Sequence, residues 1–425
     1  MKKVLIISYY FPPLGLSGVQ RAAKFAKYLP EFGWNPTILT VKDIYYYHED
    51  QSLIDEVKHC NIVRTTSLDP LRLKWIFHRK EYNAHKRNTE SNMINSKINR
   101  FIFPWLFIPD TKILWFPFAL IKAIGLIKKH QFHAILTTSP PHSSHLIGYV
   151  LNRLFDIPWT ADFRDSWLNE KYDPVPTVFH KEMNEWLKRR VICQANHVTA
   201  VSKDILNSLK SNSDSDHLHL IYNGYDPQDF HHSKLIKSNQ RLTITYCGTI
   251  NHVLNPELFL KGLQSFLSMY PDTRSKIQVI FVGSIYGINL LEEIHKLNLQ
   301  DVVKLKGYVK HEKSIQYLIE SDILLFLLPS EASAGVITGK LYEYMAAEKP
   351  ILAIIPEGEA ADIIQDYQNI KPIHSEEYHS IAMSIATLYN LWKKKVLCNL
   401  VNNTNKDLYN RKLQTKYLAK LLHIV

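Results

Sequence analysis

Short apolar segments alternate with helical patterns along almost the whole chain, and this alternation constrains the fold more than any other feature. Segments of strand length run over 4–8, 36–41, 61–65, 134–137, 160–163, 198–201 and 218–222, and again over 243–247, 278–282, 302–305, 323–328 and 351–355. Most are continuous in apolar residues, as in parallel strands buried on both faces. The pattern predicts an α/β chain with two doubly wound parallel sheets facing a cleft.

A turn-rich break at 223–227 separates the two runs of alternation. The length of 425 residues also suits two domains of ordinary size. We therefore predict an N-terminal domain over 1–222 and a C-terminal domain over 223–401. Residues 402–425 have helical spacing and are predicted to pack across the junction.

The net charge of +11 and the isoelectric point near 9.2 predict an anionic partner. Nucleotide phosphate, an acidic lipid surface and nucleic acid are all anionic, so the net charge alone does not distinguish between them. The four cysteines lie far apart without CxxC spacing, so neither a disulfide framework nor a metal site is predicted, and we expect a cytoplasmic protein. The apolar start at Val4 reads as a buried strand rather than a signal peptide.

Residues 72–126 interrupt the alternation. Residues 72–100 contain eight Lys or Arg but only two Glu, and the segment 101–109 is rich in Trp and Phe. These features predict peripheral attachment to an anionic membrane surface. The alternative for residues 115–127 is an ordinary amphipathic helix packed on the sheet.

Three residues of the first half stand at carboxyl ends of predicted strands, which is the edge that binds ligands in doubly wound sheets. Gly18 lies in the first loop, where its backbone can approach a ligand, although a glycine that merely permits a turn is the alternative. His142 lies in a Ser/Pro loop and can hydrogen-bond a substrate. Asp165 can orient Arg164 or an acceptor, or serve only as an ion pair or helix cap.

The second half has its strongest candidate site between Ile323 and Pro350. A strand is followed by a loop and then by a helix, so the backbone N–H groups near Thr338 and Gly339 form a site for a diphosphate. Lys340 can face phosphate and Glu343 can accept hydrogen bonds from ribose hydroxyls. Gly248 stands where the first strand of this half enters its loop. A solvated helix face is the alternative for Lys340 and Glu343.

Six motifs, taken in order, resemble those of glycosyltransferases of the GT-B fold, and are similar to the large retaining family 4. They are FPPLGLSGVQR, DFRDSW, VTAVSKDI, IYNGYDP, YCGTI and GKLYEYMAAEKPIL. The resemblance covers nearly the whole chain and is greatest to bacterial enzymes of surface polysaccharide synthesis. It implies two Rossmann-like domains, of which the N-terminal one lies on the acceptor side of the cleft and the C-terminal one binds the nucleotide-sugar.

The resemblance implies transfer of a sugar from a nucleotide diphosphate donor to a glycan or lipid-linked acceptor, with retention of the anomeric configuration. The nucleotide-sugar is then a substrate, and neither a cofactor, a metal nor a nucleic-acid partner is expected. Glu343 matches the second glutamate of the family's pair. Gly335 replaces the first glutamate, and Thr249 replaces the usual arginine of the donor site, so Lys340 is expected to neutralise phosphate.

Two other functions remain open from the sequence. A GT-B-like epimerase of UDP-sugars would use the same cleft without an acceptor. A non-catalytic basic scaffold that binds membrane or nucleic acid is the other. Acceptor-dependent release of nucleoside diphosphate distinguishes a transferase from both.

Overall fold

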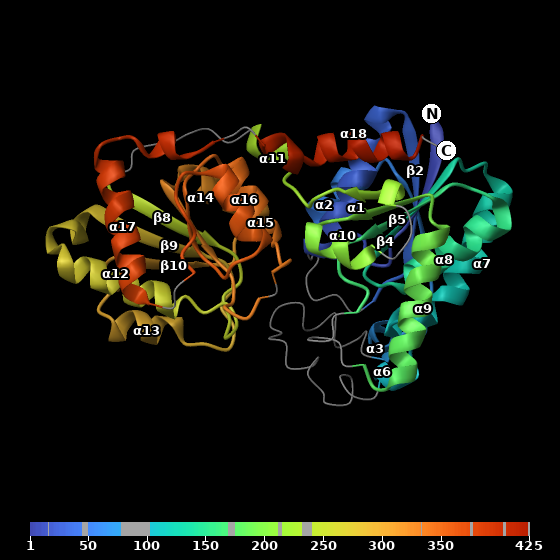
Figure 1. Ribbon diagram of the computed structural model, residues 1–425, viewed down its shortest axis with the longest axis horizontal. Coiled ribbons are helices and arrows are strands. Elements are labelled where there is room, and N and C mark those ends of the chain that lie inside the picture. The colour runs from blue at the N-terminus through green and yellow to red at the C-terminus, as the bar shows by residue number, and fades with distance from the viewer. Residues whose placement is uncertain are drawn as a thin grey trace. The chain divides into compact units, whose positions relative to one another are not determined.

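The computed structural model describes residues 1–15, 17–44, 50–77, 103–168, 175–210, 215–231, 240–332, 334–374, 377–402 and 405–423. The chain divides into two compact units. Unit 1 consists of Met1–Tyr222 and Lys412–Val425, and unit 2 consists of Asn223–Arg411. Each unit is built on one parallel β-sheet (Figure 1).

The sheet of unit 1 has the strand order β3-β2-β1-β4-β5-β6-β7, and every pair is parallel. The order reverses between β1 and β4, as in a doubly wound sheet. Its strands are β1 (Lys2–Ile7), β2 (Trp34–Val41), β3 (Asn61–Thr65), β4 (Ala134–Ser139), β5 (Trp159–Phe163), β6 (His197–Ala200) and β7 (Leu218–Leu220).

Helices cover both faces of this sheet because successive strand residues point to opposite sides. Leu5 and Ile7 face one core with α7, α8, α9 and α10, whereas Val4 and Ile6 face another with α1, α2 and α18. The helices of unit 1 are α1 (Ser17–Tyr28), α2 (Gln51–Val57), α3 (Pro70–Phe77), α6 (Phe103–Leu106), α7 (Phe116–Lys129), α8 (Ser143–Phe155), α9 (Val178–Gln194), α10 (Lys203–Leu209) and α18 (Arg411–Leu421), the last of which begins at the final residue of unit 2.

The sheet of unit 2 has the parallel order β10-β9-β8-β11-β12. Its strands are β8 (Leu242–Cys247), β9 (Ile277–Val282), β10 (Val303–Gly307), β11 (Ile323–Leu327) and β12 (Ile351–Ile354). The helices are α11 (Pro227–His231), α12 (Glu257–Met269), α13 (Leu290–Lys296), α14 (His311–Glu320), α15 (Gly339–Ala346), α16 (Glu359–Tyr367) and α17 (Tyr378–Lys393). One core joins β8 and β9 to α12 and α17.

The two parallel sheets with intervening helices confirm the predicted fold class. Every predicted strand is present, with ends that shift by a few residues. A helix forms within the predicted C-terminal segment 402–425. The helix runs over Arg411–Leu421, and Leu418 and Leu421 lie in the unit 1 core beside Trp34, whose Nε1 donates to the carbonyl of Ala419.

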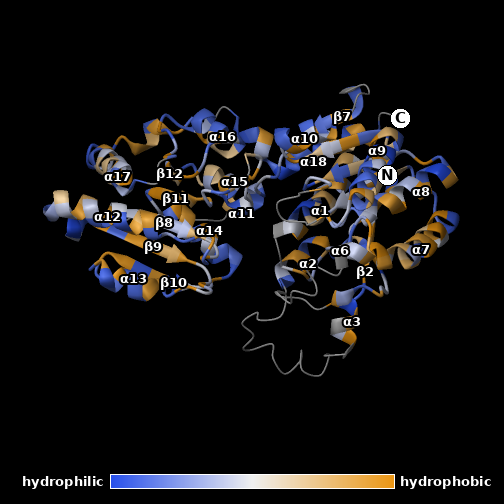
Figure 2. Cartoon of the chain, turned by 60° about the horizontal axis from the view of Figure 1, so that its bottom comes forward, coloured by the Kyte–Doolittle hydropathy of each residue, from blue (hydrophilic) through white to orange (hydrophobic). Residues whose placement is uncertain are grey.

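Residues 115–127 were predicted either to contact a membrane or to form an amphipathic helix packed on the sheet. The structure shows the helix, because α7 buries Ala119, Ala123 and Leu126 against the sheet of unit 1. Most of the predicted basic stretch 72–100, namely residues 78–100, lies outside the described residues. Figure 2 shows hydrophilic and hydrophobic residues mixed along helices such as α7 and α12, as expected of helices half-buried on a sheet. Within the described ranges, no helix is long and apolar enough to cross a membrane.

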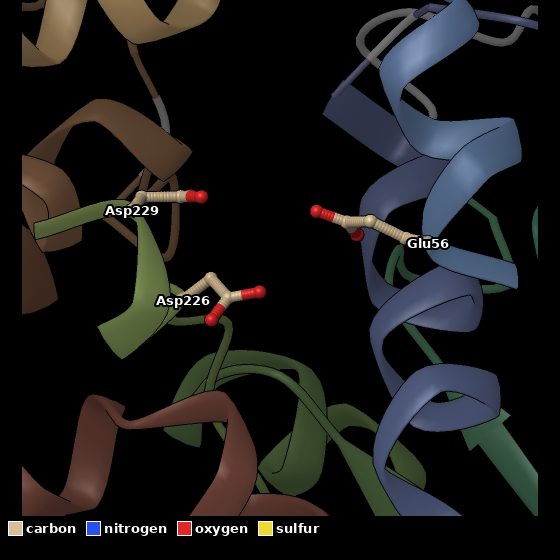
Figure 3. Close-up of side chains that lie close together, drawn as sticks. All are labelled: Glu56, Asp226 and Asp229. Carbon is tan, nitrogen blue, oxygen red and sulfur yellow. The ribbon is translucent and has the colours of Figure 1, made fainter. Parts of the chain in front are cut away.

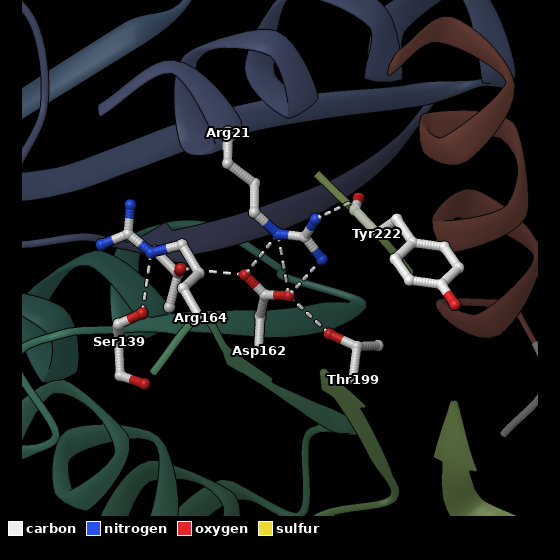
Figure 4. Close-up of polar contacts among 7 residues, drawn as sticks. Arg21, Ser139, Asp162, Arg164, Thr199 and Tyr222 are labelled. Atoms are coloured by element: carbon white, nitrogen blue, oxygen red, sulfur yellow. Dashed lines mark hydrogen bonds and ion pairs between the residues drawn. The ribbon is translucent and has the colours of Figure 1, made fainter. Parts of the chain in front are cut away.

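A buried ion pair connects α1 to the centre of the unit 1 sheet (Figure 4). The guanidinium of Arg21, 1% exposed, donates to both carboxylate oxygens of Asp162 on β5 at 2.7–3.1 Å. Its remaining terminal nitrogen donates to the carbonyl of Tyr222 at 2.8 Å. Hydroxyls of Thr138 and Thr199 also donate to Asp162, so side chains from α1, β4, β5 and β6 meet at one carboxylate.

We predict that Arg21→Met destabilises the protein by about 3–5 kcal/mol, because the Asp162 carboxylate then stays buried without its cation. The measurement is urea denaturation followed by circular dichroism. Arg274→Met is the control, since its pair with Asp301 is exposed and is worth about 0–1 kcal/mol. Equal losses in the two variants would contradict a structural role for the buried pair.

Candidate functional site

The N-terminus of α15 lies at the carboxyl edge of the unit 2 sheet, after β11 and its loop. Thr338 occupies the position before the helix, but its side chain caps no N–H group. Among the described residues its hydroxyl is buried and has no hydrogen-bond partner. The first N–H groups of a helix have no partner within the helix and carry partial positive charge. This end of α15 therefore offers several free donors to an anion.

Lys340, in the first turn of α15, is held by an aromatic side chain of the neighbouring strand. Its Nζ donates to the hydroxyl of Tyr246 at 2.8 Å and lies 4.7 Å from the ring centroid. The same hydroxyl donates to the carbonyl of Thr249 at 2.9 Å. The ammonium group is thus fixed at the carboxyl end of β8 by a residue that lies 94 positions earlier in the chain.

Gly248 makes room for this lysine. A side-chain carbon built on Gly248 would lie 2.3 Å from both Cε and Nζ of Lys340. The φ angle of Gly248 is +149°, a conformation that other residues rarely adopt. The predicted role of Gly248 as a ligand contact stays untested, but the structure gives it a definite packing role beside Lys340.

The ammonium of Lys340 is partly removed from water. Burial lowers its pKa to about 8, although nearby Cys247 and Glu343 oppose the shift. An incoming anion would restore the preference for the charged form, because an opposite charge stabilises the ammonium. Lys340 therefore suits an anionic ligand better than it suits a solvated helix face.

Glu343 follows one turn later and is half-buried. Burial raises the pKa of its carboxyl, whereas the positive charges at His311, Arg411 and Lys340 oppose the shift. None of the hydrogen bonds within the described part of the chain uses this carboxylate, so it is available to accept from ligand hydroxyls. Of the sequence-predicted donor residues, Thr338, Gly339, Lys340 and Glu343 share one helix start, and Gly248 and Thr249 lie at the adjoining strand end.

A pocket of about 560 Å³ lies elsewhere on the carboxyl edge of this sheet. It is lined by residues that follow β11 and β12, among them Leu328, Pro329 and Pro356, and by the start of α12. Its volume is in the range of small-molecule pockets. Neither Lys340 nor Glu343 lines it, so it is distinct from the start of α15.

In unit 1, the sequence-predicted residues lie at the carboxyl ends of their strands, as expected. His142 is buried, its ring stacks on Trp167 with centroids 4.8 Å apart, and its Nε2 lies 3.2 Å from the carbonyl of Ser166. Burial lowers its pKa to about 4, so the ring is neutral at pH 7. Its Nδ1 has no partner within the described residues.

Asp165 is exposed, and its neighbour Arg164 takes different partners. Arg164 donates through Nε to the carbonyl of Ser139 at 2.7 Å and through Nη2 to that of Pro140 at 3.1 Å. Within the described ranges, no ion pair joins Arg164 to Asp165. Gly18 is exposed near the start of α1 and lies beside the guanidinium of Arg164.

Three further carboxylates, those of Glu56, Asp226 and Asp229, are drawn in Figure 3. Each has a partner within its own unit. Glu56 of unit 1 accepts from Lys24 at 2.7 Å. In unit 2, Asp226 accepts from the backbone N–H of Gln228 at 3.0 Å, and Asp229 pairs with His311 at 3.1 Å. We assign these three carboxylates no metal.

The sequence analysis did not identify Tyr246, and it named Arg164 only as a residue that Asp165 can orient. The hydroxyl of a tyrosine at the end of a buried strand signals a partner, because buried Tyr O–H groups are normally hydrogen-bonded. The identity of that partner depends on which loop crosses the strand, and the sequence alone does not supply this.

Two family models match the chain. One, described as Glycosyltransferase Family 4, covers residues 18–229, and the other, described as Glycosyl transferases group 1, covers residues 227–406. A curated relative, an uncharacterized glycosyltransferase of Methanocaldococcus jannaschii, is 27% identical over 240 residues. That match covers 54% of this chain and 58% of the relative.

Solved structures with the same fold span the whole chain. HepE of Anabaena, in complex with UDP-glucose, has a TM-score of 0.61 at 12% identity, with both chains fully covered. Sucrose-phosphate synthase of Thermosynechococcus elongatus has a TM-score of 0.61 at 13% identity and is 98% covered. UDP-GlcNAc 2-epimerase of Neisseria meningitidis has a TM-score of 0.56 at 13% identity, with both chains fully covered.

We predict that the free energy of unfolding depends on pH through Lys340. Its pKa lies at about 8 in the folded protein and near the ordinary value of 10.5 in the unfolded chain, which therefore binds more protons between these values. Stability should rise with pH across this window, by up to about 1.4 kcal/mol per pH unit, relative to Lys340→Met.

Urea denaturation of both proteins between pH 7 and pH 10 measures this difference. Lys304→Met, which removes an exposed lysine, is the control. Parallel profiles for the wild type and Lys340→Met would contradict the burial of the ammonium group.

Proposed function

The chain is a glycosyltransferase of the GT-B fold and of the family 4 type, and we propose that it moves a sugar from a nucleotide diphosphate donor to a glycan or lipid-linked acceptor. Retention of the anomeric configuration and a role in cell-surface polysaccharide synthesis belong to the same proposal. The observation that carries it is the start of α15, where Thr338 with its unpartnered hydroxyl, Lys340 with its fixed ammonium and Glu343 lie within the first turns of one helix.

The donor is proposed to bind with its diphosphate at this helix start. The N–H groups of the first turn and Lys340 then meet the phosphate oxygens, and Gly248, Thr249, Thr338 and Gly339 line the approach. Glu343, one turn further on, accepts hydrogen bonds from the ribose hydroxyls. The complex of HepE with UDP-glucose supports a nucleotide-sugar as the ligand class.

Sugar transfer breaks the bond between the anomeric carbon and the leaving phosphate oxygen, and forms a bond from that carbon to the acceptor hydroxyl oxygen. Negative charge develops on the diphosphate as it leaves, so fixed donors and a cation lower the barrier. Lys340 is already held in place by Tyr246, which makes it a pre-positioned cation. The acceptor proton leaves with the diphosphate or with solvent.

In unit 1 we propose substrate-contacting roles for His142 and Asp165, with Gly18 near the donor. A neutral His142 with a free Nδ1 can hydrogen-bond a sugar hydroxyl. Full turnover of a His142→Ala enzyme would exclude this role. Asp165 is exposed and free to meet an acceptor.

A membrane-associated acceptor is supported by an apolar surface on unit 1. Trp105 and Leu106 on α6 and Val178, Phe179 and Trp186 on α9 are 51–71% exposed. The two helices adjoin, since Nε2 of His180 lies 3.3 Å from the carbonyl of Trp105 (Figure 1). Exposed Arg189 and Arg190 lie beside Trp186 on α9, which suits anionic headgroups.

A UDP-sugar epimerase is the weaker alternative. The N. meningitidis epimerase shares the fold at 13% identity and was solved with UDP-GlcNAc bound, so it supports the same ligand class without indicating which reaction this chain performs. The family models and the named relative all describe glycosyltransferases. A non-catalytic scaffold would not account for the free N–H groups and the fixed cation at the start of α15.

We predict that Glu343→Ala weakens the binding of both nucleoside diphosphate and nucleoside by at least about tenfold, because charge-assisted hydrogen bonds to the ribose are lost. Lys340→Met should weaken the diphosphate more than the nucleoside. Calorimetric titration of a panel of nucleoside diphosphates and their nucleosides measures both effects. Glu348→Ala, at an exposed glutamate after the same helix, is the control. Unchanged affinities in Glu343→Ala would exclude the donor site at α15.

We predict that replacing Val178 and Phe179 together by Ser weakens binding to anionic vesicles by more than about tenfold, since each apolar side chain contributes about 1.5–3 kcal/mol when buried. Co-sedimentation with vesicles of phosphatidylglycerol and phosphatidylcholine at low and high salt measures this. Leu291→Ser, which changes an exposed residue of unit 2, should bind as the wild type does. Equal binding of the double variant, or no binding at low salt, would count against membrane attachment.

A further inference from the structure

The pocket of about 560 Å³ in unit 2 takes no part in the proposed sugar transfer. It lies between the ends of β11 and β12 and the first turns of α12. Most of its lining residues are apolar, among them Leu254, Leu258, Leu327 and Ile354. Phe259, the aromatic hydrocarbon side chain of the lining, is only 1% exposed. The surface that a ligand would meet in this pocket is therefore largely aliphatic.

Helix α12 starts at this pocket, but its start differs from that of α15. The side-chain oxygen of Asn255 accepts a hydrogen bond from the N–H of Glu257 at 3.0 Å. Glu257 also places a carboxylate in the first turn of α12, where it offsets the positive end of the helix. Helix α15 has neither a side-chain cap nor an acidic residue in its first turn. The start of α12 is thus much less suited to an anion.

The charged side chains that line the pocket pair with each other. Nζ of Lys261 lies 2.7 Å from the carboxylate of Glu257, one turn earlier on α12. A third titratable residue, His374, donates through Nδ1 to the carbonyl of Ile355 at 2.9 Å, since a carbonyl only accepts. Among the described lining residues, no lysine or arginine is left without a carboxylate partner. The lining therefore lacks the cation that a phosphate needs.

The backbone N–H groups at the two strand ends are engaged as well. The N–H of Leu328 donates to the carbonyl of Ile354 at 3.3 Å, and that of Ile355 donates to the carbonyl of Ile373 at 3.0 Å. A proline, which has no N–H, follows each of the two donor residues in the chain. A sugar ring would bury hydroxyl groups here with few partners, which is unfavourable. An aliphatic chain needs no partners and gains free energy by leaving water.

The mouth of the pocket is open to solvent and partly polar. Val253 is 53% exposed, and Asn255 and Ser330 are also exposed. All three residues line the pocket. A chain can therefore enter from solvent and leave its polar end beside Asn255 and Ser330.

We propose that this pocket binds one aliphatic chain of a lipid, with the polar end of the lipid at the mouth. The volume is in the range of small-molecule pockets, and the lining matches the chain in polarity and in charge. Isoprenoid and fatty acyl chains share this chemistry. The site goes beyond the proposed function, which assigns unit 2 only the nucleotide-sugar. It is also separate from the exposed apolar surface of α6 and α9, which belongs to unit 1.

Calorimetric titration of geraniol and of 1-decanol into the full chain tests the pocket. Geraniol has a branched isoprenoid chain, and 1-decanol has the straight chain of an acyl lipid. Replacement of Val178 and Phe179 by Ser serves as the background, so that the apolar surface of unit 1 does not contribute. We expect saturable binding of one alcohol per protein in this background.

Two variants at the mouth should each weaken this binding by about tenfold or more. Val253→Asp places a charge at the entrance, and Ser330→Trp fills it with an indole ring. Leu291→Asp is the matched control, since Leu291 is 55% exposed on α13 and does not line the pocket. Tighter binding of geraniol would give the pocket to isoprenoid chains, and tighter binding of 1-decanol would give it to fatty acyl chains.

Absence of saturable binding by both alcohols in the background protein would overturn the site. Unchanged affinity in both Val253→Asp and Ser330→Trp, with native circular dichroism, would overturn it as well. Displacement of the bound alcohol by UDP would give the pocket to the donor instead. None of these titrations involves sugar transfer, so a negative result leaves the proposed function to its own test.

Discussion

The buried pair of Arg21 and Asp162 is the interaction on which the ligand edge of unit 1 depends. Burial alone raises the pKa of Asp162, but the charge of Arg21 and the hydroxyls of Thr199 and Thr138 outweigh this effect, and the pKa lies below its usual range. The carboxylate therefore stays charged and holds α1 to β5. Gly18 lies one helical turn before Arg21, and Arg164 lies two residues after Asp162. The ion pair thus holds the start of α1 beside the end of β5, where Gly18 lies against the guanidinium of Arg164.

In unit 2 a cation is also held in a fixed position at a strand end, but its partner is the neutral hydroxyl of a tyrosine. Tyr246 ends a buried strand, and its hydroxyl receives Lys340 while it donates to Thr249. The absence of a side chain at Gly248 leaves space for the ammonium. In both units a strand end holds a cation near the start of a helix, which is the arrangement that anionic ligands favour in doubly wound sheets.

The sequence predicts the fold well because hydrophobic periodicity is a local signal that survives tertiary packing. Buried strands such as β1 and β8 are recognisable from their own residues. The partners of Lys340 and Arg21 are not recognisable in this way. Tyr246 lies 94 positions from Lys340 and Asp162 lies 141 positions from Arg21, and only the sheet order brings them near. The packing of the C-terminal helix depends on the sheet order in the same way. Its spacing predicts a helix, but not that Leu418 packs beside Trp34 of unit 1.

The candidate residues were partly predictable. Strand ends identify Lys340, Glu343 and His142 as belonging to a ligand edge, and all three lie there. The stacking of His142 on Trp167 and the free nitrogen of Arg164 are properties of side-chain packing, which has no signature in spacing.

Hydrogen–deuterium exchange tests most directly whether the start of α15 binds the donor diphosphate. The protein is compared with and without the nucleotide-sugar that stabilises it most in a thermal-shift screen. We predict slower exchange at the amides of Gly339 to Tyr342, because the phosphate oxygens accept hydrogen bonds from the first turn. Unchanged exchange in this turn, with the ligand demonstrably bound, would contradict the assignment of the donor site to unit 2.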